Sequence, residues 1–152
     1  MKKVVIENAK VIDHKKLTDL VKKSKAHWGY TLSQMKEWDN ELTINHDYIN
    51  SNEVFKLSLD NHIIGCYSYL KINHNTVKLD FFFILPNYIG KGFGKLLMHH
   101  FFKKIENDTI KKIMVESDPN AENFYANYGF KTIDKLKSSI ENRFLPLMQK
   151  DI

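Results

Sequence analysis

Hydrophobic residues recur at two different spacings along this chain, and the spacing changes from one stretch to the next. Alternation of apolar and polar positions predicts strands, whereas apolar residues three and four positions apart predict helices. The pattern divides the chain into about seven strands and about four helices, which is typical of a mixed α/β fold. The predicted strands span residues 4–10, 54–59, 63–72, 76–85, 112–117, 130–136 and 143–148, and the predicted helices span residues 15–25, 32–42, 93–105 and 121–128.

The fourth predicted strand changes character halfway along. Its first half alternates, with Lys78 and Asp80 between apolar neighbours, so it has one apolar and one polar face. Residues 81–85 are apolar at every position, which indicates a strand covered on both faces. We therefore expect this strand at the centre of the sheet, with Pro86 ending it.

The apolar faces of the helices identify candidate core residues. In residues 15–25 the face consists of Leu17, Leu20, Val21 and Ser24; in 32–42 of Met35, Trp38 and Leu42; in 93–105 of Phe93, Leu96, Leu97, Phe101 and Ile105; and in 121–128 of Ala121, Phe124, Tyr125 and Tyr128. Asp118 before Pro119 is a typical helix start, because aspartate caps unpaired amides and proline is favoured at the first helical position. Gly129 is a typical helix end.

Length and composition favour a single domain over residues 1–152. The chain has 152 residues, of which 43% are hydrophobic, enough for one core. Its one cysteine, Cys66, lies in an apolar run, so we expect a core residue, with a reactive thiol as the alternative. No apolar stretch approaches the roughly 20 residues that span a bilayer, and Glu7 interrupts the basic N-terminus too early for a signal peptide. We therefore expect a cytoplasmic protein without a membrane partner.

The charge balance is moderately basic. The formal net charge is +5, from 23 Lys and Arg against 18 Asp and Glu. That balance suits an anionic ligand, but it also suits an ordinary solvated surface. Lysines are spread along the whole chain rather than gathered in a basic run, so nucleic-acid binding is the least favoured function. The seven histidines show no metal-ligand spacing, and no metal is expected.

A glycine-rich turn, Gly90-Lys91-Gly92-Phe93-Gly94, separates the central strand from the next helix. Glycines let the backbone approach a phosphate, and the unpaired amides at a helix start attract anions. The P-loop needs Ser or Thr after Gly-Lys, but Leu96 follows Lys95 here. The Gly-x-Gly-x-x-Gly spacing of dinucleotide-binding folds is also missing. The turn therefore indicates an anion site, with close packing of the helix on the strand as the alternative.

A second motif follows the next predicted strand. Residues 121–130 read Ala-Glu-Asn-Phe-Tyr-Ala-Asn-Tyr-Gly-Phe. This run and residues 84–97 resemble two motifs of the GNAT superfamily of N-acetyltransferases, in the right order and at the right separation. The resemblance covers nearly the whole chain. It implies the GNAT fold, a central mixed and mostly antiparallel sheet of about six to seven strands flanked by about four helices.

Two positions depart from the family pattern. Ile89 stands where the family usually has Arg or Gln; this position contributes its backbone amide to phosphate binding, which isoleucine retains. Asp118 stands where many members have Asn. We therefore expect the anion site to persist at the turn with less help from side chains, and we do not expect Asp118 itself to contact the cofactor.

The resemblance also implies roles for individual residues, with acetyl-CoA as cosubstrate. The implied cofactor-binding residues are Phe82, Phe83, Ile84, Ile89, Gly90, Lys91, Gly92, Phe93, Gly94, Lys95, Asn120, Asn123 and Tyr125. A backbone amide of residues 82–84 would stabilise the oxyanion of the tetrahedral intermediate. Tyr125 matches the tyrosine that protonates the departing CoA thiolate, and with pKa values of about 8.5 and 10 the two groups are nearly balanced. Its alternative role is packing.

The general base and the acceptor site are less specific in sequence. Glu116 and Asp80 are the candidate bases, and a carboxylate serves only if desolvation raises its pKa or if it works through a water. Trp28 and Tyr30, together with Trp38, fall in the region that covers the acceptor pocket in the family, where aromatic rings can hold an amine by cation–π contact. Ordinary packing is the alternative for these rings.

The function that follows is direct transfer of an acetyl group from acetyl-CoA to a primary amine of a small molecule or peptide, by a cytoplasmic, bacterial-type acyltransferase. The alternative is a CoA-binding sensor or interaction module without turnover. The acceptor is left open, because acceptor loops vary within such folds. Homodimers are common in the family, so a second copy of the chain is a candidate partner.

Overall fold

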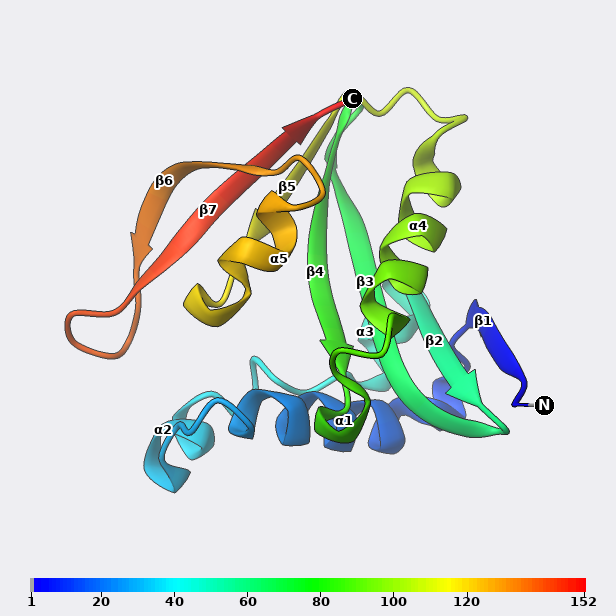
Figure 1. Cartoon of the computed structure of the whole chain (residues 1–152), viewed down its shortest axis with the longest axis horizontal. Coiled ribbons are helices and arrows are strands. Elements are labelled where there is room, and N and C mark those ends of the chain that lie inside the picture. The colour runs from blue at the N-terminus through cyan, green and yellow to red at the C-terminus, as the bar shows by residue number, and fades with distance from the viewer. Residues whose placement is uncertain (1) are drawn as a thin grey trace. The chain divides into compact units, whose positions relative to one another are not determined.

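The computed structural model describes residues 2–152, and within them it contains seven strands and five α-helices (Figure 1). The strands are β1 Val4–Asn8, β2 Glu53–Leu59, β3 His62–Asn73, β4 Thr76–Ile84, β5 Lys112–Glu116, β6 Lys131–Lys137 and β7 Phe144–Asp151. The α-helices are α1 His14–Ala26, α2 Leu32–Glu37, α3 His46–Ser51, α4 Phe93–Ile105 and α5 Glu122–Ala126, and short 3-10 turns occur at η1 Val11–Asp13, η2 Pro86–Tyr88 and η3 Pro119–Ala121. The mixed α/β prediction is confirmed.

The strands form one sheet in the order β1-β2-β3-β4-β5-β7-β6. β1 pairs antiparallel with β2, and β7 pairs antiparallel with both β5 and β6, whereas β4 and β5 are parallel. β4 is therefore central, as its apolar second half predicts. Its ladder with β5 runs only from Thr76↔Lys112 to Leu79↔Val115, although β4 continues to Ile84.

The chain divides into two compact units, within each of which residues contact one another. The first contains the residues up to Ser68 together with Phe81–Ile105, and the second contains Tyr69–Asp80 and Glu106–Ile152. The glycine turn lies in the first unit and Tyr125 in the second. No helix of the described residues is long and apolar enough to cross a membrane.

In the first unit, α1 buries the four residues that its spacing predicts. α4 buries Met98 in place of Leu96, whose side chain is 44% exposed, so that part of the prediction is wrong. Met98 is two residues after Leu96, about 200° further round the helix, and shares a face with Phe101 and Ile105. Cys66 is fully buried, and burial raises the pKa of its thiol to about 12, so the core interpretation is confirmed.

The segment between α1 and β2 differs most from its prediction. α2 ends at Glu37 rather than at residue 42, and the buried Trp38 follows its last turn. α3 was not predicted, because its six residues bury only Ile49 and show no helical stripe. Its start is fixed locally, since the Asn45 side chain accepts a hydrogen bond from the Tyr48 amide at 2.8 Å.

In the second unit, β7 pairs with β5 on one side and with β6 on the other along most of its length. The pairing with β6 has one irregularity, between Thr132 and Asp134. Asp118 caps η3 by accepting the Asn120 amide, Pro119 is at its first position, and Gly129 ends the helical segment with φ +92°. The predicted start and end of the second motif are therefore confirmed. The segment that they bound, η3 and α5, connects β5 to β6 in the sequence.

Candidate functional site

The turn after β4 adopts a conformation that requires glycine at two positions. Gly90 and Gly92 have φ values of +79° and +88°, which residues with a side chain rarely adopt. A Cβ atom added at either position would meet nothing within 4 Å. Close packing therefore does not explain these two glycines, whereas the backbone path of the turn does.

That path leaves a row of amides without acceptors. Ile89 donates to the Pro86 carbonyl at 3.3 Å, and Leu96 donates to the Gly92 carbonyl at 3.2 Å. Between them, the amides of residues 90–95 have no hydrogen-bond acceptor in the part of the chain that the structure describes. The peptide dipoles of α4 add roughly half a positive charge at the same end. This arrangement suits an anion with several oxygen atoms, such as a pyrophosphate.

The two charged side chains of this turn, Lys91 and Lys95, are both exposed. Ile89 is 45% exposed, and its amide donates to the Pro86 carbonyl at 3.3 Å, so a phosphate at this amide would share or replace that bond. The Lys91 ammonium lies 5.8 Å from the centre of the Tyr88 ring, in cation–π geometry. The backbone amides are therefore the polar groups of this turn whose positions the fold fixes.

The end of β4 is held rigidly by its neighbours in the first unit. The Leu85 amide donates to the Ile64 carbonyl at 2.8 Å, and the Ser24 hydroxyl of α1 donates to the Ile84 carbonyl at 3.0 Å. A Cβ on Gly65 of β3 would lie 2.7 Å from the Ile84 Cδ1 atom. The absence of a side chain at Gly65 thus allows β3 to approach β4 where Phe82, Phe83 and Ile84 were expected to bind the pantetheine arm.

Tyr125 lies in the second unit and is only 6% exposed. Its ring packs edge-on against Phe124 and Phe130, at centroid distances of 5.4 and 5.7 Å. Phe124 and Tyr128 are half-buried and pack against each other at 5.2 Å between centroids, so Tyr125 is the most buried ring of the three. Burial, and after it the negative charge of Asp118, raises the pKa of the Tyr125 phenol above its usual range. Tyr125 therefore stays protonated at neutral pH and is a weaker acid than the sequence suggested.

Asp118 has a structural role that explains its departure from the family pattern. Its Oδ1 atom accepts hydrogen bonds from the Asn120 amide and side chain, both at 2.8 Å. Its Oδ2 atom accepts from the Arg143 guanidinium at 3.0 Å, and both side chains of this pair are about seven-eighths buried, at 12% and 13% exposure. Arg143 is the only arginine of the chain. Asp118 thus links η3 to the segment before β7. Asn123, another predicted cofactor-binding residue, is exposed on α5.

The two candidate bases are both exposed. Glu116 is 45% exposed and forms a 3.6 Å ion pair with Lys78, and Asp80 is exposed on β4. Neither carboxylate has the desolvated setting that direct proton abstraction requires, so a role through a water is favoured for either. Among the described residues, no three His, Cys, Asp or Glu side chains gather as metal ligands.

The aromatic residues of the predicted acceptor region separate into two groups. Tyr30 packs edge-on against Trp38 with centroids 4.9 Å apart, and the Lys25 ammonium lies 5.4 and 5.1 Å from these two rings. Trp28 is 42% exposed and contacts His27. The ring that joins Tyr30 around a cation is thus Trp38, the third aromatic residue of the predicted acceptor region, rather than Trp28.

Residues 16–151 match the family described as the acetyltransferase (GNAT) domain. The chain belongs to this family. Its fold is similar to the PaiA N-acetyltransferase of Thermoplasma acidophilum in complex with coenzyme A, with a TM-score of 0.79 and 17% identity over 99% of both chains. It is also similar to the ribosomal-protein-S18-alanine N-acetyltransferase of Escherichia coli, with a TM-score of 0.73 and 14% identity over 99% of this chain and 94% of that one.

Two further relatives are a structure solved with acetyl-CoA and a sequence that matches over part of its length. A GNAT family acetyltransferase from Elizabethkingia anophelis, solved with acetyl-CoA bound, has a TM-score of 0.66 and 17% identity over 99% of this chain and 98% of that chain. An uncharacterized N-acetyltransferase, ycf52, from Gracilaria tenuistipitata var. liui is 39% identical over 49 residues. That match covers 32% of this chain and 27% of the relative's length. The solved structures establish the fold alone, since their identities are low.

Proposed function

We propose that this GNAT chain is an N-acetyltransferase that transfers the acetyl group of acetyl-CoA to a primary amine of a small molecule or peptide. The observation that carries the proposal is the row of acceptor-free amides at residues 90–95, among the residues described. A CoA pyrophosphate has negatively charged oxygen atoms that can accept hydrogen bonds from these amides. Coenzyme A or acetyl-CoA in two structures of similar fold supports the same ligand.

The proposed reaction is a direct transfer within a ternary complex. The amine nitrogen attacks the thioester carbon, the oxyanion accepts a hydrogen bond from a backbone amide of residues 82–84, and the carbon–sulfur bond breaks. A water that hands the amine proton to Glu116 or Asp80 acts as base, in line with the exposure of both carboxylates. Tyr125 donates its proton to the departing thiolate, and the proton taken from the amine returns to the phenolate through water. The raised pKa of the phenol makes this transfer less favourable than it would be from an ordinary tyrosine.

The proposed acceptor carries a positive charge. The Tyr30–Trp38 pair already holds an ammonium group, that of Lys25, in cation–π contact. An acceptor ammonium would take the place of Lys25 over these rings, which favour a cation over a neutral amine, and its reacting nitrogen loses a proton before attack. With Trp28 exposed beside them along the chain, we propose this region as the acceptor side of the site.

A Tyr125→Phe variant tests the catalytic role. We expect turnover in a free-thiol assay to fall by roughly 10²-fold, the lower end for a lost proton donor, while CoA affinity by calorimetry changes less than about threefold. Tyr128→Phe, a half-buried tyrosine near the same helix, serves as the matched control and should retain turnover. Full activity of Tyr125→Phe would remove Tyr125 from the mechanism.

A CoA-binding module without turnover is the second candidate function. The burial of Tyr125 and the exposure of both carboxylates favour it, since none of these groups has a setting tuned for proton transfer. Both candidates predict that CoA raises the unfolding temperature. Only the enzyme predicts thiol release that requires both acetyl-CoA and an amine, so a diverse panel of amines separates the two.

A further inference from the structure

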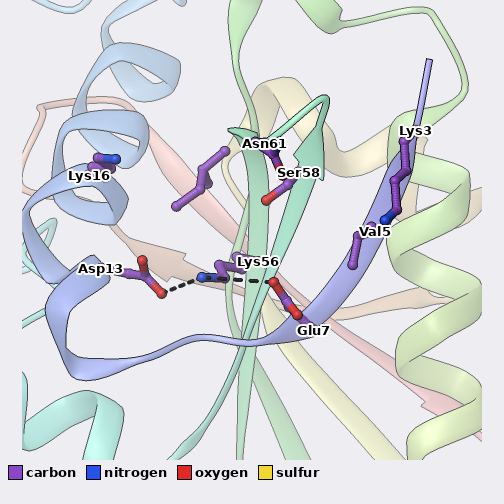
Figure 2. Close-up of a pocket in the computed structure, with 9 residues that line it drawn as sticks. Lys3, Val5, Glu7, Asp13, Lys16, Lys56, Ser58 and Asn61 are labelled. Atoms are coloured by element: carbon purple, nitrogen blue, oxygen red, sulfur yellow. Dashed lines mark hydrogen bonds and ion pairs between the residues drawn. The ribbon is translucent and has the colours of Figure 1, made fainter.

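A polar hollow of about 360 Å³ lies in the first unit, on elements that the GNAT turn does not use (Figure 2). Its lining comes from β1, η1, α1, β2, the turn after β2 and the start of β3. The lining residues are Lys3, Val5, Glu7, Asp13, Lys16, Lys56, Ser58, Asn61 and Ile63. We call this the β1–β2 hollow. Its volume is in the range of small-molecule sites, but its lining is mainly polar and charged, which excludes an apolar ligand.

A buried ion pair forms one edge of the hollow. The Lys56 ammonium donates to the Asp13 Oδ2 atom at 2.8 Å, and each side chain is only 11% exposed. The same Asp13 oxygen also accepts the Lys10 amide at 2.8 Å. Glu7 lies 4.0 Å from Lys56 on the other side and is 54% exposed, as Figure 2 shows. Lys56 and Asp13 thus satisfy one another and fix the shape of this edge.

Two further lysines face the hollow without such neutralisation. Lys3 directly precedes β1 and Lys16 lies on α1, on opposite sides of the view in Figure 2. Among residues 2–152, neither ammonium has a hydrogen-bond or ion-pair partner. Ser58 and Asn61 also line the hollow, and their side chains have no partner among the same residues. The hollow therefore offers donors from three elements that are not used within the described chain.

The charges favour an anion. Three ammonium groups and two carboxylates give the lining a net charge of +1, and the Lys56–Asp13 pair cancels within itself. Lys3 and Lys16 remain, and within the lining the half-exposed Glu7 balances them in part. Outside the lining, the Asp60 carboxylate accepts a hydrogen bond from the Lys3 backbone amide at 2.8 Å. A group of like charges around a concave surface raises the local concentration of counter-ions. A dianion would neutralise both lysines, and Glu7 would accept a hydrogen bond from a hydroxyl group on the same molecule.

We propose that the β1–β2 hollow binds a small hydroxylated dianion, a phosphate monoester or a dicarboxylate, independently of the CoA turn. Lys3 and Lys16 bind the anionic groups, Ser58 and Asn61 donate hydrogen bonds, and Glu7 selects for the hydroxyl. The Lys56–Asp13 pair positions these groups without contacting the anion's charge directly. The ligand's charge makes the affinity fall with rising salt, because all the contacts are near the surface.

An NMR titration of the full chain tests this proposal with glycerol 3-phosphate, malate and inorganic phosphate as probes and glycerol as the uncharged comparison. We expect saturable shifts of the amides at residues 3–7, 13–16 and 56–61, for one of the two organic dianions more strongly than for inorganic phosphate. The Lys16→Gln variant should weaken binding about tenfold, as the loss of one charged hydrogen bond does. Lys36→Gln, which removes the same charge from α2 outside the hollow, should leave the affinity unchanged.

Three outcomes would overturn the proposal. The first is the absence of saturable shifts at residues 3–61. The second is equal weakening by Lys16→Gln and Lys36→Gln, which would show a net-charge effect only. The third is a response confined to residues 90–95, which would assign the anion to the glycine turn. Repeating the titration with saturating CoA separates the two sites, since the hollow should bind its ligand equally well in both cases.

Discussion

Removal of the Asp118 carboxylate should destabilise the fold strongly, and the amount can be worked out from its contacts. Asp118 caps η3 through the Asn120 amide, and loss of a helix cap costs about 1 kcal/mol. Its ion pair with Arg143 is about seven-eighths buried, so its loss should cost about 2–3 kcal/mol, below the value for a fully buried pair. Asp118→Ala should therefore lose about 3–4 kcal/mol of the free energy of unfolding.

Asp118→Asn separates the two contributions. Asparagine caps helices about as well as aspartate, so this variant should lose only the ion-pair part, about 2–3 kcal/mol. With a urea slope near 2 kcal/mol/M, the midpoint should fall by roughly 1–1.5 M for Asn and by roughly 1.5–2 M for Ala. Asp39→Ala is the matched control, because Asp39 pairs with Lys22 at an exposed site, 60% and 34% exposed, and should cost under about 1 kcal/mol.

The reasoning makes two points that urea melts can refute. A wild-type midpoint for Asp118→Asn would show that the pair with Arg143 does not stabilise the fold. Equal midpoints for the Asn and Ala variants would show that the cap contributes nothing. A change in slope rather than in midpoint would mean that the unfolded state, not the native contact, has changed.

Two further predictions concern the first unit. Gly65→Ala should lower the free energy of unfolding by about 1–3 kcal/mol through overpacking, because the new Cβ would lie 2.7 Å from Ile84 Cδ1. A lower midpoint of thermal unfolding would measure this loss, and an unchanged midpoint would show that Ile84 moves freely. Burial raises the pKa of Asp13, but the hydrogen bonds from Lys56 and from the Lys10 amide outweigh burial, so the pKa is lowered. The ionised Asp13 therefore stabilises the fold above about pH 4, and this stabilisation is lost as the pH falls through the lowered pKa. Asp13→Asn should therefore flatten the fall in stability below about pH 4, and an equally steep fall in both proteins would contradict this origin.

Local sequence signals predicted the strands because strand pairing here depends on alternation and on short turns. Asp60 and Asn61 form the two-residue turn after β2, with φ values of +49° and +69°, and the polar Asp-Asn-His sequence predicts such a turn. Seven strands were predicted, and each overlaps a strand of the structure. Helix α3 was missed, because its stability comes from the Asn45 cap and from packing rather than from an apolar stripe.

Only the glycine turn of the candidate site was predictable from the sequence, because its glycines reflect the backbone conformation directly. The glycine spacing indicated the turn, and the structure adds that Gly90 and Gly92 need positive φ while space around them is open. Burial of Tyr125 depends on packing with Phe130 and on Asp118, which the sequence cannot rank.

The β1–β2 hollow had no sequence signal. Lys56 lies between two apolar residues of a strand, and its partner Asp13 is 43 positions earlier in the chain. A lysine in that position would ordinarily face solvent. Only the fold brings the two side chains together.

The central claim, that the amides at residues 90–95 bind the CoA pyrophosphate, is tested most directly by calorimetry of CoA with Gly92→Ala. Alanine resists a φ of +88° by about 1–2 kcal/mol, so the amides should lose their arrangement and the Kd should rise about tenfold. Gly29→Ala is the matched control, with φ +87°, open surroundings and a place in the same unit. The account predicts CoA binding by the wild type and by Gly29→Ala, with weakened binding by Gly92→Ala. Equal affinity in all three proteins, or no binding by the wild type, would contradict it.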